Sequence, residues 1–129
     1  MTDVIGSAVY FVSSLTYDKK SGSIFYTNNN NGWRDLFTVN IDEKKPRQLI
    51  KDLRAGYLVF NEHDESLWAV RHFNGIASLI RITKPYDDWE RVYTMPYGED
   101  LFDIDISPNG KYLSAAIGDV SGFQKLVLL

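Results

Sequence analysis

Short apolar stretches separated by polar turns recur along this chain at a nearly constant spacing. Three pairs of stretches align with one another: 15–18 with 23–27, 58–61 with 66–70, and 104–107 with 111–115. Tyr17 precedes Phe60 by 43 positions, and Phe60 precedes Ile106 by 46. Each pair has the length of two strands joined by a tight turn, so the pattern predicts a β-hairpin that occurs three times.

The correspondence continues downstream of each hairpin. A further apolar stretch follows in every unit, at 35–39, 78–82 and 125–129, and another follows in the first two units, at 47–50 and 90–93. A period of about 40–45 residues with four short strands is typical of a propeller blade. We therefore expect an all-β protein of about three four-stranded antiparallel blades, a partial β-propeller, with blades at about 8–51, 56–94 and 101–129.

Turn-forming residues lie between the apolar stretches. Gly22, residues 28–32, Asn74-Gly75 and Asn109-Gly110 tolerate the positive φ that tight hairpins require. All four prolines also fall between the stretches, where a missing N–H removes no ladder hydrogen bond. The local chemistry agrees with a meander of strands and predicts a turn at 28–32.

The third hairpin carries the most specific signal. Residues 106–113, Ile-Ser-Pro-Asn-Gly-Lys-Tyr-Leu, resemble the F-S-P-D-G-K-x-L hairpin of TolB-like and WD-like β-propeller repeats, with Asn109 where the family has Asp. The turns at 17–22 and 60–65 are looser versions of it. The resemblance implies the propeller fold. It also implies a repeat of the kind found in larger exported bacterial proteins, where such propellers serve as protein-interaction or gating platforms.

The repeat pattern predicts fewer blades than a closed propeller ring contains. Propellers have about four to eight blades, whereas this chain has about three, and the third stops at Leu129 before its fourth strand. Two explanations stay open: the chain is a piece of a longer propeller, or two copies associate to complete a ring. Residues 2–7 offer a closing outer strand. Because open blade edges favour association, we expect a homo-oligomer, most simply a dimer.

The net charge and the lengths of the apolar runs argue against nucleic acid and membrane as partners of this chain. The net charge of −3 argues against nucleic acid, because binding phosphates needs a concentrated positive field. The basic residues of 44–54, Arg54 among them, alternate with acidic ones and indicate a solvated face. No apolar run approaches the roughly 20 residues that span a bilayer. The stretch 4–12 follows Asp3 and lacks a positive n-region, so we expect neither membrane insertion nor a signal peptide in this chain.

Asp103 and Asp105 are spaced to share one face of a strand, with Ser107 on the same side. Oxygen ligands suit Ca²⁺ or Mg²⁺, so one interpretation is a metal site. The alternative is that both carboxylates accept hydrogen bonds from turn amides or face water, and we favour it because no further ligand is evident. The chain has no cysteine and only two distant histidines, so we expect no metal and no cofactor.

Arg71, His72 and Asn74 bring clustered polar donors to the end of one predicted strand, near a blade loop. We expect His72 to be buried and hydrogen-bonded, with a ligand contact as the alternative. His63 lies in a turn that we expect to be exposed.

Two of the three tryptophans lie next to loops. Trp33 follows the Asn-rich segment and Trp89 follows the acidic loop at 85–88, whereas Trp68 takes a core position of the repeat. Trp33 and Trp89 are therefore the candidates for an exposed binding platform. Anchoring of a loop at the blade edge is the interpretation that we favour.

Catalytic motifs are absent from the sequence: it contains no H-E-x-x-H, G-x-S-x-G, P-loop or G-x-G-x-x-G pattern. We therefore expect no enzyme activity. The leading hypothesis is a protein-protein interaction or scaffold module of TolB-like type, with contacts at Arg71, His72, Asn74, Asp103 and Asp105. Two alternatives are an accessory domain that gates substrate in a larger, peptidase-like hydrolase, and a propeller that binds a metal or small ligand.

Overall fold

The computed structural model describes residues 15–30, 33–119, 121–122 and 124–128. The predicted closing strand at 2–7 and the start of the first blade lie outside these residues. The described strands are β1 (Leu15–Asp18), β2 (Ser23–Asn30), β3 (Trp33–Asn40), β4 (Arg47–Ile50), β5 (Ala55–Asn61), β6 (Ser66–Phe73), β7 (Ile76–Ile82), β8 (Glu90–Thr94), β9 (Glu99–Ile106), β10 (Leu113–Asp119) and β11 (Gln124–Leu128).

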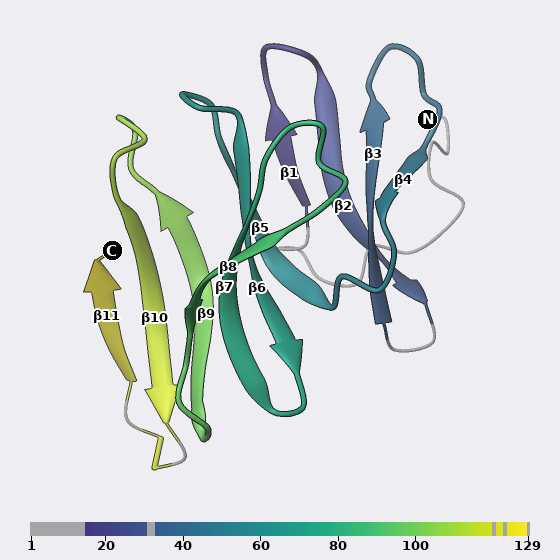
Figure 1. Ribbon diagram of the computed structural model, residues 1–129. Helices are drawn as coiled ribbons and strands as arrows, with labels where there is room; N and C mark the ends of the chain where they lie inside the picture. The colour runs from purple at the N-terminus through teal and green to yellow at the C-terminus, as the bar shows by residue number, and fades with distance from the viewer. Residues whose placement is uncertain (1–14, 31–32, 120, 123, 129) are drawn as a thin grey trace.

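The strands form three antiparallel meanders that follow one another along the chain. The orders are β1-β2-β3-β4, β5-β6-β7-β8 and β9-β10-β11, and they make up blades one, two and three. Figure 1 shows the three sheets side by side, from blade one near the N-terminus to blade three at the C-terminus. The expected all-β fold of blade-like sheets is confirmed. In the described part of the chain the sheets form an open row, and the third sheet has three strands.

The first hairpin differs in detail from the expectation. Asn28, Asn29 and Asn30 continue strand β2 and pair with Asp35, Arg34 and Trp33. The predicted turn at 28–32 is therefore wrong for these three residues. Asparagine is a poor strand former by propensity, but the ladder to β3 supplies a partner for each backbone group, and this outweighs the propensity.

Buried polar side chains cap the turn between the first two strands of blades one and two. Asp18 and Asn61 are 7% and 5% exposed and lie 43 residues apart. The Asp18 carboxylate accepts hydrogen bonds from Lys20 N at 3.0 Å and Ser21 Oγ at 2.7 Å. Asn61 Oδ1 accepts a bond from His63 N at 3.0 Å. These bonds satisfy turn amides locally, which explains the tolerance for two buried polar residues.

Two apolar clusters hold the three sheets together. Phe25, Leu36, Leu67 and Ile80 belong to the cluster shared by blades one and two. There the ring of Phe25 stacks on Phe60 at 5.8 Å between centroids. The second cluster, around Val70, Leu79, Leu101 and Leu113, joins blades two and three. Each fully buried side chain of this size contributes roughly 1.5–3 kcal/mol, so the interfaces between blades are the main source of stability.

The turns of blades two and three also contact each other directly. Asn61 Nδ2 donates a hydrogen bond to Gly110 O at 3.1 Å, and His63 Nε2 lies 2.6 Å from Pro108 O. His63 is exposed, as expected, but its ring is tied to the next blade. The described residues include no helix long and apolar enough to cross a membrane.

Candidate functional site

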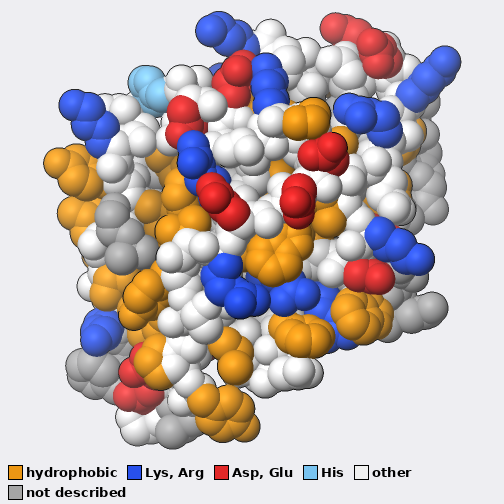
Figure 2. All heavy atoms as spheres, in the orientation of Figure 1, with side chains coloured by type: hydrophobic (Ala, Val, Ile, Leu, Met, Phe, Trp, Pro, Cys, Tyr) orange, Lys and Arg blue, Asp and Glu red, His pale blue; other side chains and the backbone are white. Residues whose placement is uncertain are grey.

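Aromatic and arginine side chains from blades one and two stack alternately at one end of the sheets. The series contains Trp33, Arg54, Phe73, Arg71, Trp89 and Arg91, and we call it the arginine–aromatic ladder. Figure 2 shows blue Lys and Arg side chains between orange hydrophobic ones below the centre of the viewed face. The ladder therefore combines three positive charges with three aromatic rings.

Distances along the ladder fit cation–π stacking. The Cζ atoms of Arg54 and Arg71 both lie 4.9 Å from the centroid of Phe73. Arg71 Cζ is also 4.7 Å from the ring of Trp89, and Arg91 Cζ is 5.7 Å from the same ring. Arg54 in addition lies over Trp33.

Local backbone geometry positions Arg71, Phe73 and Arg54 in the arginine–aromatic ladder. Residues two apart on a strand share a face, which puts Arg71 beside Phe73 on β6. Arg54 precedes β5 with a φ of 56°, and its N–H donates to Arg34 O at 3.1 Å. This bond fixes the link between blades one and two against β3, so that Arg54 reaches the ring at the start of β3.

The three arginines of the ladder have no acidic partner among the described residues, whose ion pairs involve other cations. Burial, followed by the charges of Arg91 and Arg54, lowers the pKa of Arg71. Arg71 Nε donates to Leu53 O at 3.1 Å, whereas Arg54 Nε is buried and has no hydrogen-bond partner in the described structure. The site thus holds three positive charges close together, and no ion pair among the described residues involves them.

A small hollow opens between two of these arginines. Its volume is about 110 Å³, and its lining includes Arg71, Arg91, Phe73, Ser78 and Thr94. The register explains the lining, because Arg71 pairs with Ser78 and Ser78 pairs with Thr94 across β6, β7 and β8. Arg71, Arg91, Ser78 and Thr94 therefore line one hollow, and each of these side chains carries a group that can donate hydrogen bonds.

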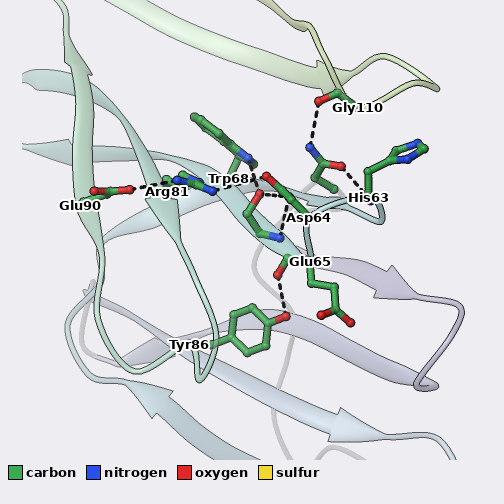
Figure 3. Close-up of polar contacts among 10 residues, drawn as sticks. His63, Asp64, Glu65, Trp68, Arg81, Tyr86, Glu90 and Gly110 are labelled. Atoms are coloured by element: carbon green, nitrogen blue, oxygen red, sulfur yellow. Dashed lines mark hydrogen bonds and ion pairs between the residues drawn. The ribbon is translucent and has the colours of Figure 1, made fainter.

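A second arginine stack lies on the other side of blade two, shown in Figure 3. Arg81 Cζ is 5.8 Å from the ring of Trp68, and its Nη groups meet Asp64 at 3.4 Å and Glu90 at 3.5 Å. Burial raises the pKa of Asp64, but hydrogen bonds from Ser66 and the charge of Arg81 outweigh it, so the pKa lies below its usual value. This stack differs from the ladder because its arginine is already neutralised by carboxylates.

A larger apolar groove of about 380 Å³ lies between blades two and three. Trp68, Val92, Tyr93, Tyr112 and Leu113 are among its lining residues. Trp68 is half-buried and donates from Nε1 to Ser66 Oγ at 2.9 Å, so it lines this groove as well as the core.

The predicted site residues separate into two groups. Arg71, Trp33 and Trp89 come together in the ladder. His72 is exposed, contrary to the expectation of burial, and its Nε2 lies 2.8 Å from Asp100 Oδ1. Its side chain is 44% exposed because β6 ends here beyond the packed interface and alternation along the strand directs it away from Arg71. Asn74 takes a φ of 51° in the turn that follows, which is a structural role.

Asp103 and Asp105 are both exposed on β9. Asp103 lies at a bulge with a φ of 51°, and Asp105 accepts a hydrogen bond from Ile106 N at 2.8 Å. Burial and the charges of Asp103 and Asp100 raise the pKa of Tyr57, which places these groups near one another. No group of three His, Cys, Asp or Glu suited to a metal occurs in the described residues, so the metal interpretation gains no support.

Sequence reasoning missed half of the ladder and the hydroxyl groups beside it. Arg54 was part of a basic stretch interpreted as a solvated face, yet it is half-buried on Trp33. Phe73 and Arg91 carried one usable signal: each lies two residues from another ladder member, at Arg71 and Trp89. The stacking of one such pair on the other depends on the pairing of strands and could not be read from spacing alone.

The two four-stranded antiparallel sheets and the three-stranded sheet that follows them define a β-propeller type of fold. It is TolB-like: the structure of a putative TolB from Agrobacterium tumefaciens superposes with a TM-score of 0.66 and 13% identity, over 88% of this chain and 48% of that one. This confirms the fold that the sequence resemblance implied. The structure of hydrazine synthase from Kuenenia stuttgartiensis superposes with a TM-score of 0.60 and 12% identity, over 89% of this chain and 41% of that one.

A protein from Lactobacillus plantarum has a TM-score of 0.51 at 12% identity, over 91% of this chain and 41% of that one. This chain therefore spans less than half the length of each of these structures. No protein-family model and no curated protein matches the sequence. At this level of identity the similarity concerns the fold, which hosts many unrelated functions.

Proposed function

We propose that this chain is a non-catalytic protein-interaction module whose contact surface is the arginine–aromatic ladder. The observation that carries the proposal is the stacking, on three aromatic rings, of three arginines that have no acidic partner among the described residues. Arginine, tryptophan and other aromatic residues are enriched at the centres of protein interfaces, where a few such anchors supply most of the binding energy.

Pre-organisation supports the same proposal. Each guanidinium group of the ladder lies against at least one ring, so its side-chain rotamers are already restricted before a partner arrives. A long, free arginine loses rotamer entropy on binding, and stacking in the unbound chain lowers that cost. Phe73 is 39% exposed and adds apolar area to the same surface.

The histidines offer little support for catalysis. In the described residues His63 contacts Pro108 O and His72 contacts Asp100, and neither is hydrogen-bonded to a hydroxyl group. A nucleophile activated by a base needs such a contact within hydrogen-bond reach.

A second candidate is an accessory domain of a larger enzyme. The similarity to a chain of a hydrazine synthase favours it only at the level of fold, because the identity is 12% and the chain covers 41% of that structure. The reading frame around this chain discriminates between the two candidates: an adjoining segment with a metal-binding or catalytic-triad motif favours the accessory role.

Affinity capture from the source cell tests the interaction module. The wild-type chain, the double variant R71Q/R91Q and the control R47Q are immobilised and exposed to the same lysate. Arg47 is exposed on β4 and outside the ladder, so R47Q controls for loss of a surface charge. We expect one set of proteins that binds wild type and R47Q and is lost with R71Q/R91Q. Equal recovery by all three chains contradicts the proposal.

A further inference from the structure

Among the described residues, no carboxylate pairs with an arginine of the ladder, whereas carboxylates of blade two pair with Arg81. Arg81, stacked on Trp68, has two carboxylates within 3.5 Å, from Asp64 and Glu90. Arg71 is stacked in the same way on Trp89 and has Arg54 and Arg91 as its charged neighbours. Close like charges repel unless an anion lies between them. Among the described residues, the two arginine stacks of blade two therefore differ in that carboxylates pair with Arg81 and with none of the ladder arginines.

The orientation of the groups defines what fits. Aromatic rings lie within 5.7 Å of the Cζ atoms of Arg54, Arg71 and Arg91, and a ligand binds a guanidinium group at its N–H edges. Those edges bind carboxylate and phosphate oxygens through paired hydrogen bonds. Beside them, Ser78 Oγ and Thr94 Oγ1 lie 3.4 Å apart and line the same hollow. The hollow is therefore small, and four of its lining side chains carry groups that can donate hydrogen bonds.

The volume of the hollow limits which ligands fit inside it. The hollow measures about 110 Å³, whereas pockets that enclose a whole small-molecule ligand measure roughly 300–1,000 Å³. An acidic side chain enters such a hollow while the rest of its chain stays outside. The ladder continues from this point to Arg54 and Trp33, which gives room for further acidic residues of the same segment.

Nucleic acid fits these observations less well. Bases bind to protein by stacking on open aromatic faces, whereas the rings of Phe73 and Trp89 each have two arginine Cζ atoms within 5.7 Å of their centroids. The chain as a whole carries a net charge of −3, which repels a polyanionic backbone beyond the ladder. A short acidic segment needs only the local positive field.

We propose that the hollow between Arg71 and Arg91 binds the side-chain carboxylate of an acidic peptide segment, and that Arg54 binds a second carboxylate of that segment. The inference rests on the proposed function and names the chemistry of the partner. Ser78 and Thr94 donate hydrogen bonds to the first carboxylate, and the rings of Phe73 and Trp89 hold the guanidinium edges towards it.

The test measures binding of a fluorescein-labelled hexaglutamate peptide by anisotropy, with a hexaglutamine peptide as the uncharged control. Arg91 is the residue to change first because it is exposed and, among the described aromatic rings, stacks on Trp89 alone. Hydrogen bonds to charged groups are among the stronger ones, so we expect R91Q to weaken binding at least about tenfold. R47Q, which removes the same charge elsewhere, is expected to weaken it less than about twofold.

A second measurement keeps the test valid if a variant is unstable. In the wild-type chain, the ¹⁵Nε–¹Hε signals of Arg54 and Arg71 are followed by NMR during titration with hexaglutamate. We expect both to shift, and the Arg81 signal to stay in place, because Arg81 already has its carboxylates. Inorganic phosphate and an oligothymidylate are titrated in parallel arms.

Three results overturn the inference: equal binding of the glutamate and glutamine peptides, equal loss in R91Q and R47Q, or tighter binding of phosphate or oligothymidylate than of hexaglutamate. Failure of this inference is distinguishable from failure of the proposed function. If lysate capture depends on the ladder but hexaglutamate does not bind, only the carboxylate chemistry is wrong. If capture is independent of the ladder, the interaction surface itself is wrong.

Discussion

Tyr57 and Asp103 lie 46 residues apart and occupy the same position in successive blades, each with a left-handed backbone at a φ of 54° and 51°. Tyr57 and the next residue of β5 face Ala69 alone, and Asp103 and the next residue of β9 face Ala115 alone. Both alanines are fully buried. Each inner strand thus carries one β-bulge at the same place, which bends it against the neighbouring blade.

The bulge predicts that valine and glycine substitutions rank in opposite order of stability at Asp103 and Asp105. Asp103 has positive φ, where a β-branched residue is strained and glycine is not, whereas Asp105 is an ordinary strand residue. We expect D103V to be less stable than D103G by about 1–2 kcal/mol in the free energy of unfolding. At Asp105 the order reverses, because valine favours strands and glycine does not. Urea unfolding of the four variants measures this, and the same order at both positions contradicts the bulge.

Gly110 tests the contact between the turns of blades two and three. A Cβ at this position lies 2.7 Å from His63 Cδ2 and 2.8 Å from Asn61 Oδ1, and φ is 73°. We expect G110A to lower the free energy of unfolding by about 2–4 kcal/mol, from backbone strain and overpacking together. Gly122 is the matched control, since its φ is 85° and nothing lies within 4 Å of its added Cβ.

G122A keeps the backbone strain without the steric contact, and we expect a loss of about 1 kcal/mol. Equal losses for G110A and G122A in thermal or urea unfolding show that the turns do not meet as described.

The fold was predictable because its signals are local. Hairpin turns with Asn-Gly and Gly, and apolar stretches at a fixed period, specify blades without any knowledge of long-range contacts. The ladder was predictable only in part. Arg71, Trp33 and Trp89 carried chemistry that drew attention, but their assembly depends on which strand ends meet at one edge. The burial expected for His72 failed for the same reason, since its place beyond the interface is set by neighbouring blades.

Tyr86 predicts a specific dependence of stability on alkaline pH. Burial, followed by the charges of Glu65, Asp18 and Asp64, raises the pKa of Tyr86 from 10.0 to about 12. The folded chain therefore favours the neutral phenol. This stabilisation is complete below pH 10 and is lost as pH rises from about 10 to about 12.

Y86F supplies the control, because phenylalanine cannot ionise. It loses the hydrogen bond from Tyr86 Oη to Glu65 O at 2.7 Å, so at pH 8 we expect it to be about 1–2 kcal/mol less stable than wild type. Between pH 10 and 12 the wild type loses more stability than Y86F, and the gap between them narrows. A constant gap in denaturant unfolding across this range rules out the raised pKa.

Strand β11 bears on self-association, which we propose as a dimer. It pairs with β10, and its other edge has no partner strand among the described residues. Leu126 and Leu128 are 79% and 69% exposed beside this edge, while Val127 between them packs into the second core cluster. An open edge flanked by exposed leucines favours pairing with another strand.

A charged residue on such an edge blocks that pairing, and Tyr97 offers a control because it is 82% exposed in a loop. In light scattering behind size-exclusion chromatography we expect wild type and Y97K to run as dimers over a concentration series, and L126K as a monomer of 14.8 kDa. A wild-type chain that stays monomeric at every concentration contradicts the proposed dimer. A dimer that persists in L126K shows that the dimer interface does not involve β11.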